Sequence, residues 1–202
     1  TVGDGPLPLL PRPVAQLDSN TLVVAELGLT NVTSPSAYPD VGVYLVDIPT
    51  GNRTFLSRLT YYRLGFTRTV IVNGSAAGTV TLGDDEGGQG PVMNTQCRSV
   101  VVVNGRIFVS ESIFLGGSSF LGGILEIDRQ TGDRTLVAGH AFVDDGTQSQ
   151  VIEVLPTGAS SVNLDAPISL QDDGGGNLLF THLFGTDGLY PIHRYNLNSG
   201  VL

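Results

Sequence analysis

Basic, aromatic and redox-active side chains are scarce in this sequence. Its 202 residues include no Lys and no Trp, so all ten basic residues are Arg, while 19 carboxylates set the formal net charge at -9. No apolar run approaches the roughly 18 residues that a membrane-spanning helix requires. An acidic chain without a basic patch has no means of neutralising a row of phosphates. We therefore expect neither a nucleic-acid partner nor a membrane span.

Cysteine occurs once, as Cys97. The chain therefore forms no internal disulfide, and a lone cysteine is most often a small buried apolar residue. A leftover cysteine in a secreted protein can also pair with another chain. The sequence leaves both interpretations of Cys97 open.

Three Asn-x-Ser/Thr sequons point to the secretory pathway. They are Asn31-Val-Thr, Asn52-Arg-Thr and Asn73-Gly-Ser, and each is a glycan acceptor only in a secreted eukaryotic protein. Asn52 lies in a predicted tight turn, so we expect it to be exposed. The sequence predicts a secreted, extracellular glycoprotein that carries glycans at these three residues.

Glycine and proline are plentiful by contrast, at 27 and 11 residues, and several of the glycines lie at the turns of a repeated pattern. Residues 42–57 and 123–138 share the pattern apolar-x-apolar-Asp-x-x-Thr-Gly-x-Arg-Thr-apolar, and residues 192–200 carry a weaker copy with Asn196 in the Asp position. Alternating apolar residues indicate a strand, Asp and Thr side chains bond the backbone of a turn, and Gly supplies positive φ. Each copy therefore predicts a β-hairpin.

Two further strands precede each hairpin. The first strands are expected at 13–17, 99–103 and 166–170, and the second at 21–26, 106–111 and 177–182, with a turn between them. This order predicts an all-β fold in which a four-stranded antiparallel meander occurs three times. We place these blades at about 12–57, 92–138 and 162–202, and we expect 58–91 and 139–161 to be loops between blades.

The hairpin Gly123-Ile-Leu-Glu-Ile-Asp-Arg-Gln-Thr-Gly-Asp-Arg-Thr-Leu-Val resembles the outer hairpin of six-bladed, TolB-like and gluconolactonase-like β-propellers. The resemblance covers most of the chain and implies a blade architecture. It leaves the function open, because this superfamily includes lactonases, lyases, dehydrogenases and non-catalytic scaffolds.

Propellers have about four to eight blades, so three blades imply that others are supplied from elsewhere. In one interpretation residues 1–5, which resemble the outer strand at 135–139, pair with the third blade and close a ring with other copies of the chain. In the other, the chain is a piece of a longer polypeptide. The expected partners are accordingly the remaining blades of the same polypeptide or other copies, joined through unpaired strand edges.

The most specific candidate site lies at the ends of the second strand of each predicted blade. Glu26, Glu111 and His182 occupy equivalent positions in the three predicted blades, and propellers bind ligands where such strand ends converge on the central channel. The resemblance to gluconolactonase-like proteins implies a divalent cation there, and Ca²⁺, Mg²⁺ or Zn²⁺ would suit these side chains. The alternative is that the three residues end their strands and meet solvent.

Acidic pairs beside glycines are a second kind of candidate metal site. They are Asp84 and Asp85, Asp144 and Asp145, and Asp172 and Asp173. Carboxylates with nearby backbone carbonyls suit Ca²⁺, which is therefore the candidate cofactor. None of the pairs has EF-hand spacing, and charge pairs in Gly-rich loops are commonly solvated turns.

No combination of nucleophile, base and acid stands out in the sequence. We therefore expect a non-catalytic propeller segment with a structural, assembly or ligand-binding role in a larger secreted glycoprotein, its ligand a protein or a glycan. One alternative is a metal-dependent lactonase or lyase with a cation in the central channel. Another is a carbohydrate-binding or adhesive module formed by the inter-blade loops.

Overall fold

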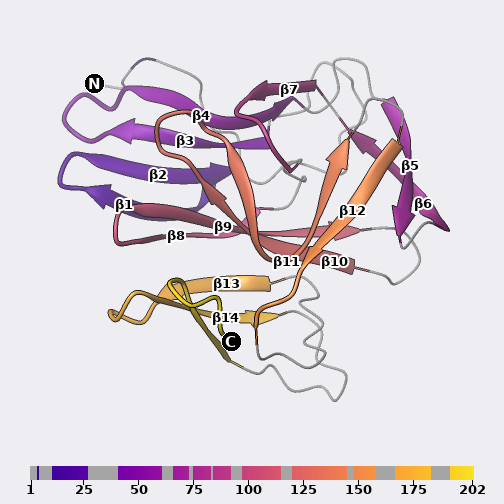
Figure 1. The fold of residues 1–202 in the computed structure, drawn as a ribbon. Coiled ribbons are helices and arrows are strands. Elements are labelled where there is room, and N and C mark those ends of the chain that lie inside the picture. Colours follow the sequence, from indigo (N-terminus) through magenta and orange to yellow (C-terminus); the bar gives the residue numbers. More distant parts are fainter. Residues whose placement is uncertain are drawn as a thin grey trace.

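The computed structural model of the chain is all-β over the residues that it describes, as the sequence predicted. Those residues are 4, 11–26, 41–60, 66–72, 75–82, 84–91, 97–114, 120–144, 148–157, 167–182 and 192–202. They form three sheets of five, seven and three strands and contain no helix (Figure 1). None of these sheets closes on itself in the described part of the chain.

The first sheet begins with the predicted meander. Strands β1 (Pro11–Asp18), β2 (Thr21–Glu26), β3 (Val41–Asp47) and β4 (Arg53–Thr60) pair antiparallel in chain order, and we call these four strands the first meander. A short strand, β7 (Asp84–Gly87), then pairs with β4 at the edge. Apolar residues alternate with polar ones along much of β1 and form nearly continuous runs in β2 and β3, both of which are strand patterns. Tight turns connect neighbouring strands at two of the three joints of the meander.

The second sheet is larger than the sequence predicted. Strands β8 (Cys97–Val103), β9 (Arg106–Phe114), β10 (Phe120–Ile127) and β11 (Arg134–Asp144) form the second meander. The sheet continues through β12 (Gln148–Val154), which pairs antiparallel with β11 and parallel with β5 (Phe66–Val72), and ends at β6 (Ser75–Leu82).

The expectation that 58–91 and 139–161 are loops is therefore wrong. The first range contains β5, β6 and β7, and the second contains the end of β11 and all of β12. These segments lie outside the repeat, although the stretch Thr79-Val-Thr-Leu82 alternates polar and apolar residues. Pairing in the extended sheet satisfies their backbone hydrogen-bonding groups, which a long loop leaves to water.

The third sheet is a shorter version of the same unit. Strands β13 (Pro167–Asp172), β14 (Asn177–His182) and β15 (His193–Asn196) pair antiparallel and form the third meander. After the turn of this meander, Val201 makes isolated bridges to Asn196 and Thr157.

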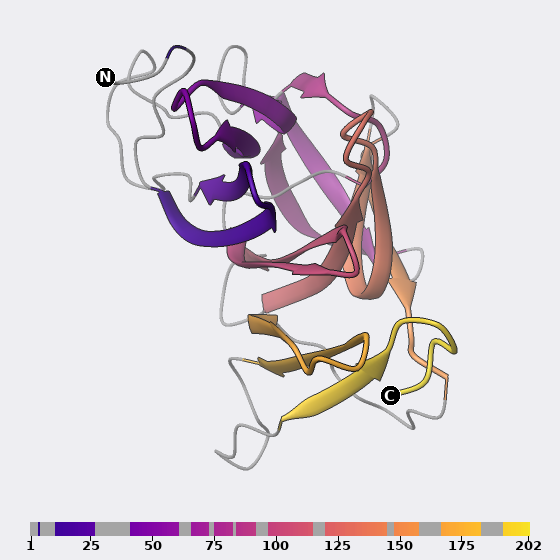
Figure 2. The same ribbon diagram turned by 90° about the vertical axis from the view of Figure 1, so that its left-hand side faces the viewer.

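The three meanders are stacked, with the second in the middle (Figures 1 and 2). One face of the second meander, including Ile107 and Val109, shares an apolar core with the first meander. Its opposite face, including Phe108 and Ile124, shares a separate core with Leu178 and Phe180 of the third. Successive side chains of β9 therefore belong to two different cores, because neighbouring residues of a strand point to opposite faces of the sheet.

The predicted hairpin turn recurs in all three meanders. The backbone N–H groups of Asp47, Asp128 and Asn196 each donate to the carbonyl five residues later, at 2.8–2.9 Å. The side chains of the same three residues accept from the N–H three residues later, at 2.8–2.9 Å. The glycines at 51, 132 and 200 have φ of 73°, 77° and 68°, which residues with a side chain rarely adopt.

Candidate functional site

The three residues predicted at strand ends occupy the same place in their meanders, although β9 continues to Phe114, so that Glu111 lies inside its strand. Glu26, Glu111 and His182 lie opposite the first residue of the preceding strand, in the pairs Pro11–Glu26, Cys97–Glu111 and Pro167–His182. The backbone register thus confirms their equivalence. The side chains of Glu26 and His182 lie outside the described residues, so the metal site that they suggest stays a prediction.

Glu111 is fully buried, and so is Cys97 opposite it. Burial raises the pKa of the Cys97 thiol, and the negative charge of Glu111 raises it further. The thiol is therefore protonated and a poor nucleophile near neutral pH. Cys97 packs in the core between the first and second meanders, which favours the structural interpretation of this residue.

Two of the three acidic pairs lie in or beside strands. Asp84 and Asp85 belong to β7 and pair with Thr60 and Leu59, although a loop was expected there. Asp144 ends β11. Asp145 and the side chains of the other three carboxylates lie outside the described residues. Within the residues that are described, no group of three His, Cys, Asp or Glu side chains is placed to hold a metal ion.

The third pair, Asp172 and Asp173, forms the β13–β14 turn, as predicted. Asp172 accepts the N–H of Gly174 at 2.9 Å, and Asp173 accepts those of Gly175 and Asn177 at 2.7 and 3.1 Å. The turn thus uses both carboxylates to fix its own backbone, which is the Asx-turn geometry. This arrangement favours the solvated-turn interpretation of the pair over a Ca²⁺ site.

Asp173 is also the centre of a polar network. Its Oδ2 accepts from Nδ2 of Asn177 at 2.8 Å and from Nε and NH2 of Arg194 at 2.8 and 2.7 Å. The Asn177 amide and the Gly175 N–H, with Arg194 adding to them, lower the pKa of Asp173 to about 2. The carboxylate is therefore ionised over the whole physiological range.

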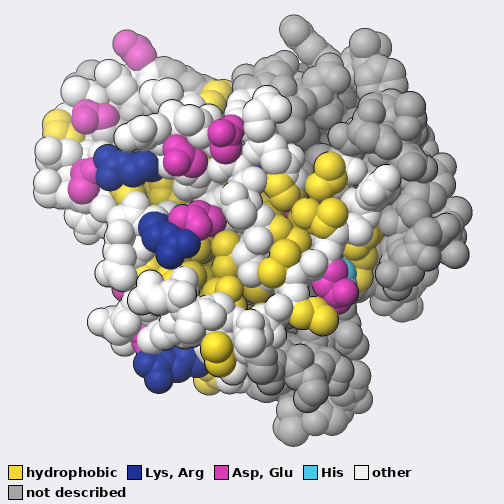
Figure 3. All heavy atoms as spheres, in the orientation of Figure 1, with side chains coloured by type: hydrophobic (Ala, Val, Ile, Leu, Met, Phe, Trp, Pro, Cys, Tyr) yellow, Lys and Arg dark blue, Asp and Glu magenta, His cyan; other side chains and the backbone are white. Residues whose placement is uncertain are grey.

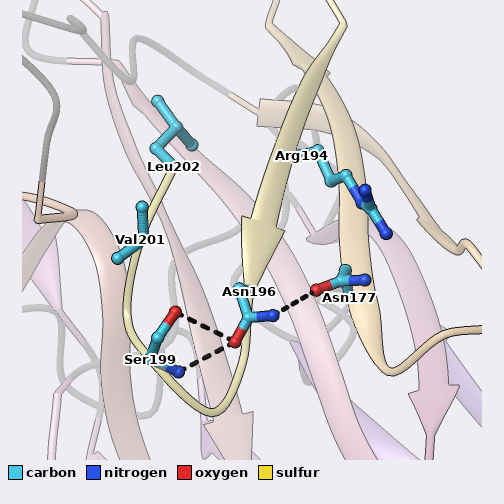
Figure 4. A pocket seen from close by; sticks show the side chains of 6 residues that line it. All are labelled: Asn177, Arg194, Asn196, Ser199, Val201 and Leu202. Atoms are coloured by element: carbon cyan, nitrogen blue, oxygen red, sulfur yellow. Dashed lines mark hydrogen bonds between the residues drawn. The ribbon is translucent and has the colours of Figure 1, made fainter.

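A pocket of about 390 Å³ lies beside this network, on the third meander (Figure 4). It is lined by Asn177, Arg194, Asn196, Ser199, Val201 and Leu202. The Asn196 amide donates to Oδ1 of Asn177 at 2.8 Å and accepts from Ser199 through its own Oδ1. Figure 4 shows the pocket between β15 and the arm formed by residues 199–202. Sequence reasoning interpreted these residues only as a hairpin, so the pocket was missed.

Arg134 joins the first two meanders, a role that the sequence analysis also missed. Its side chain is 3% exposed. The guanidinium donates to the carbonyl of Pro91 at 2.6 Å, to Oγ of Ser57 at 2.9 Å and to the carbonyl of Gly87 at 2.9 Å. These acceptors lie on β4 and on the segment 87–91, which runs from the end of β7 toward β8, so the buried cation of β11 connects two other segments of the chain.

A second contact recurs beside each hairpin turn. The N–H groups of Arg53, Arg134 and Leu202 donate to the carbonyls of Asp4, Gln89 and Thr157 at 2.8, 2.7 and 3.3 Å. Each acceptor precedes the first strand of the same meander. Residues 3–6 and 88–91 share the sequence Gly-x-Gly-Pro, and this second repeat was the available sequence signal.

Asp4 is the one described residue of the range 1–5. It lies at the turn of the first meander, where its N–H donates to Oδ1 of Asn52 at 2.9 Å. Thr157 holds the corresponding place beside Leu202 in the third meander. The closing of a ring with other copies of the chain through residues 1–5 stays a prediction.

One of the three predicted glycosylation sites can be located. Asn52 is exposed in the β3–β4 turn. Its Oδ1 accepts from Asp4, which leaves the amide nitrogen, the atom that carries an N-linked glycan, directed elsewhere. Asn31 and Asn73 lie outside the described residues.

The molecular surface, the search for a membrane-spanning helix and the comparisons with known proteins add three findings. On the face shown in Figure 3, Arg and carboxylate side chains lie beside one another, and the described residues there form no large area of one charge. The described residues contain no helix that is long and apolar enough to cross a membrane. Comparison with protein-family models, curated proteins and solved structures found no match for this chain.

Proposed function

We propose that this chain is a non-catalytic segment of a secreted β-propeller, with a structural, assembly or ligand-binding role in a larger glycoprotein. The observation that supports this proposal most directly is the stacking of three like meanders on two apolar cores, with Arg134 buried between the first two. Stacked repeats that bury a continuous core form rigid scaffolds. The propeller arrangement itself is part of the proposal.

The charged side chains of the described residues also favour a scaffold. Arg106 and Glu126 form a two-bonded ion pair across β9 and β10 at 2.7 and 2.6 Å. Arg194 pairs with Asp173 on the third meander. Each pair lies on one sheet or one turn, where cross-strand charge pairs contribute to sheet stability.

Metal content and activity together test the scaffold proposal. The chain, purified without chelators, should contain well below one equivalent of Ca²⁺, Mg²⁺ or Zn²⁺ by elemental mass spectrometry, and it should not hydrolyse a panel of lactones. The second candidate function is a metal-dependent lactonase or lyase. It is favoured by the equivalent register of Glu26, Glu111 and His182 and by the complete burial of Glu111. A stoichiometric cation that Glu111→Gln removes together with lactonase activity would establish that candidate instead.

Secretion is tested through Asn52. Expressed in a eukaryotic secretory system, the chain should lose mass on treatment with an N-glycan-releasing amidase, and Asn52→Gln should remove one glycan. Thr54→Ala is the matched control, because it destroys the same sequon and leaves the Asn52 amide in place. A secreted chain with no glycan at Asn52 would contradict the glycosylation prediction.

A further inference from the structure

The turn between β3 and β4 holds an earlier segment of the chain through two hydrogen bonds. The N–H of Asp4 donates to Oδ1 of Asn52 at 2.9 Å. The carbonyl of Asp4 accepts from the N–H of Arg53 at 2.8 Å. We call this pair of bonds the first latch. Because the first latch uses the backbone of Asp4 and not its side chain, any residue other than Pro at position 4 can form it.

The second meander has the same pair of bonds at the turn between β10 and β11, and we call it the second latch. The N–H of Gln89 donates to Oδ1 of Asp133 at 2.7 Å, and the carbonyl of Gln89 accepts from the N–H of Arg134 at 2.7 Å. Asp133 thus holds in the second meander the place that Asn52 holds in the first. Where Asp133 has a second carboxylate oxygen, Asn52 has an amide nitrogen, which takes no part in the first latch.

That amide nitrogen is the acceptor atom of the sequon Asn52-Arg53-Thr54. The folded turn fixes the backbone of all three sequon residues. The carbonyl of Asn52 accepts from the N–H of Asp47 at 2.9 Å, and the first latch holds the N–H of Arg53. Thr54 lies opposite Leu45 in the β3–β4 ladder. An enzyme that must take this segment into its own binding site can therefore do so only when the turn opens.

We propose that the first latch controls N-glycosylation of Asn52: the glycan is added while the latch is open, and the closed latch excludes the transferring enzyme. The donor is an oligosaccharide linked to a lipid diphosphate. In the transfer, the Asn52 amide nitrogen forms a bond to C1 of the first sugar, the diphosphate leaves C1 with the electron pair, and one amide proton passes to solvent. This proposal rests on the secreted glycoprotein proposed above and adds the regulation of one of its glycosylation sites.

The second latch is a more tightly packed copy of the first. A Cβ at Gly88 would lie 1.9 Å from the Gly132 carbonyl oxygen, and a Cβ at Gly90 would lie 2.1 Å from the Arg134 carbonyl oxygen, so this latch segment lies directly against its turn. Arg134 is buried, whereas its counterpart Arg53 is half-buried. We therefore expect the second latch to open less often than the first.

Two substitutions at position 4, expressed in a eukaryotic secretory system, test the proposal. Asp4→Pro removes the N–H that Asn52 accepts, whereas Asp4→Ala keeps both backbone groups of the first latch. Mass spectrometry of the secreted chain gives the ratio of glycosylated to unglycosylated Asn52. This ratio should rise about fivefold in Asp4→Pro, because the loss of one hydrogen bond favours opening, and it should stay unchanged in Asp4→Ala.

Gly105→Ala controls for a general loss of stability, because it strains the β8–β9 turn of the second meander and leaves the first latch intact. The ratio at Asn52 should not change in this variant. An equal rise in Gly105→Ala and Asp4→Pro, or no rise in Asp4→Pro, would overturn the proposal.

The second latch supplies a matched site within the same chain. Asp133→Asn creates an Asn-Arg-Thr sequon at 133–135, with the same three residues as 52–54, and keeps an Oδ1 that can accept from Gln89. Glycan occupancy at this sequon should be lower than at Asn52, and adding Gln89→Pro should raise it. Occupancy at the new sequon equal to or above that at Asn52 would contradict control by the latch.

The outcomes separate this proposal from the proposed function on which it rests. Glycan occupancy at Asn52 that is the same in both position-4 variants overturns the latch proposal and leaves the secreted glycoprotein standing. A secreted chain that carries no glycan in any variant overturns the latch proposal and the glycosylation prediction together. A bound cation with lactonase activity would overturn the scaffold proposal without changing the glycan ratios.

Discussion

At the scale of single residues, Arg134 has the contacts with the largest predicted effect. Its guanidinium supplies donors to three oxygen acceptors from two neighbouring segments. Arg134→Ala leaves those acceptors without their donor in a dry junction, so we expect the free energy of unfolding to fall by about 2–4 kcal/mol.

Urea denaturation measures this loss. Arg129→Ala is the control, because Arg129 is exposed in the β10–β11 turn and its removal should change the unfolding free energy by less than about 0.5 kcal/mol. Equal effects of the two substitutions would show that the buried guanidinium contributes little to stability.

The lowered pKa of Asp173 predicts that the stability of the fold depends on pH below about pH 4. Its folded pKa of about 2 lies below the ordinary value of 3.8. The stabilisation that it supplies is therefore fully present above about pH 4 and is lost as the pH falls toward 2, since the unfolded state then binds the proton more readily. Asp173→Asn should lower the melting temperature at pH 6 and have a smaller effect at pH 2. A difference that stays constant over this range would contradict the assigned pKa.

At the scale of elements, the hairpin turns depend on glycine for two separable reasons. Gly105, in the β8–β9 turn, has φ of 75° and open space around its missing Cβ, whereas Gly132 has φ of 77° and a Cβ there would lie 1.9 Å from the Leu56 carbonyl oxygen. At both positions the positive φ makes a residue with a side chain unfavourable. Of the two, only Gly132 also lies so close to a neighbouring meander that a Cβ would collide with it.

Alanine substitution separates these two causes. Gly105→Ala should cost about 1–2 kcal/mol from the left-handed backbone alone. Gly132→Ala should cost about 3 kcal/mol or more, because overpacking adds to the same backbone term. Thermal unfolding of the two variants measures the difference, and similar melting temperatures would contradict the close approach of the β10–β11 turn to β4.

At the scale of the whole molecule, Cys97 reports on the interface between the first two meanders. It is 1% exposed and belongs to their shared core. A thiol reagent should therefore modify native protein only when that interface opens, and Arg134→Ala should speed the modification because it removes a contact across the junction. Quenched labelling time courses at several reagent concentrations measure the rate of thiol modification. Rapid, stoichiometric labelling of the unaltered protein at neutral pH would show that the core is accessible.

The hairpins and meanders could be predicted from sequence because their determinants are local. Asp47 and Asp128 form hydrogen bonds with backbone groups two to five residues away, and a Gly with positive φ follows at a fixed spacing. The equivalence of Glu26, Glu111 and His182 followed from the same repeat. By contrast, β12 pairs with β5, which lies about 80 residues earlier in the chain, and no local pattern shows which distant strand completes a sheet.

The sequence by itself determined the all-β class, the three hairpin turns and the alternation that gives each strand two faces, because these depend on the chemistry of neighbouring residues. Only the tertiary structure decided that Arg134 is buried between meanders and that Asp4 lies beside Asn52. Each of these depends on which surfaces pack together. Packing is decided by the burial of apolar area and the pairing of backbone groups over the whole chain, which no single segment of sequence specifies.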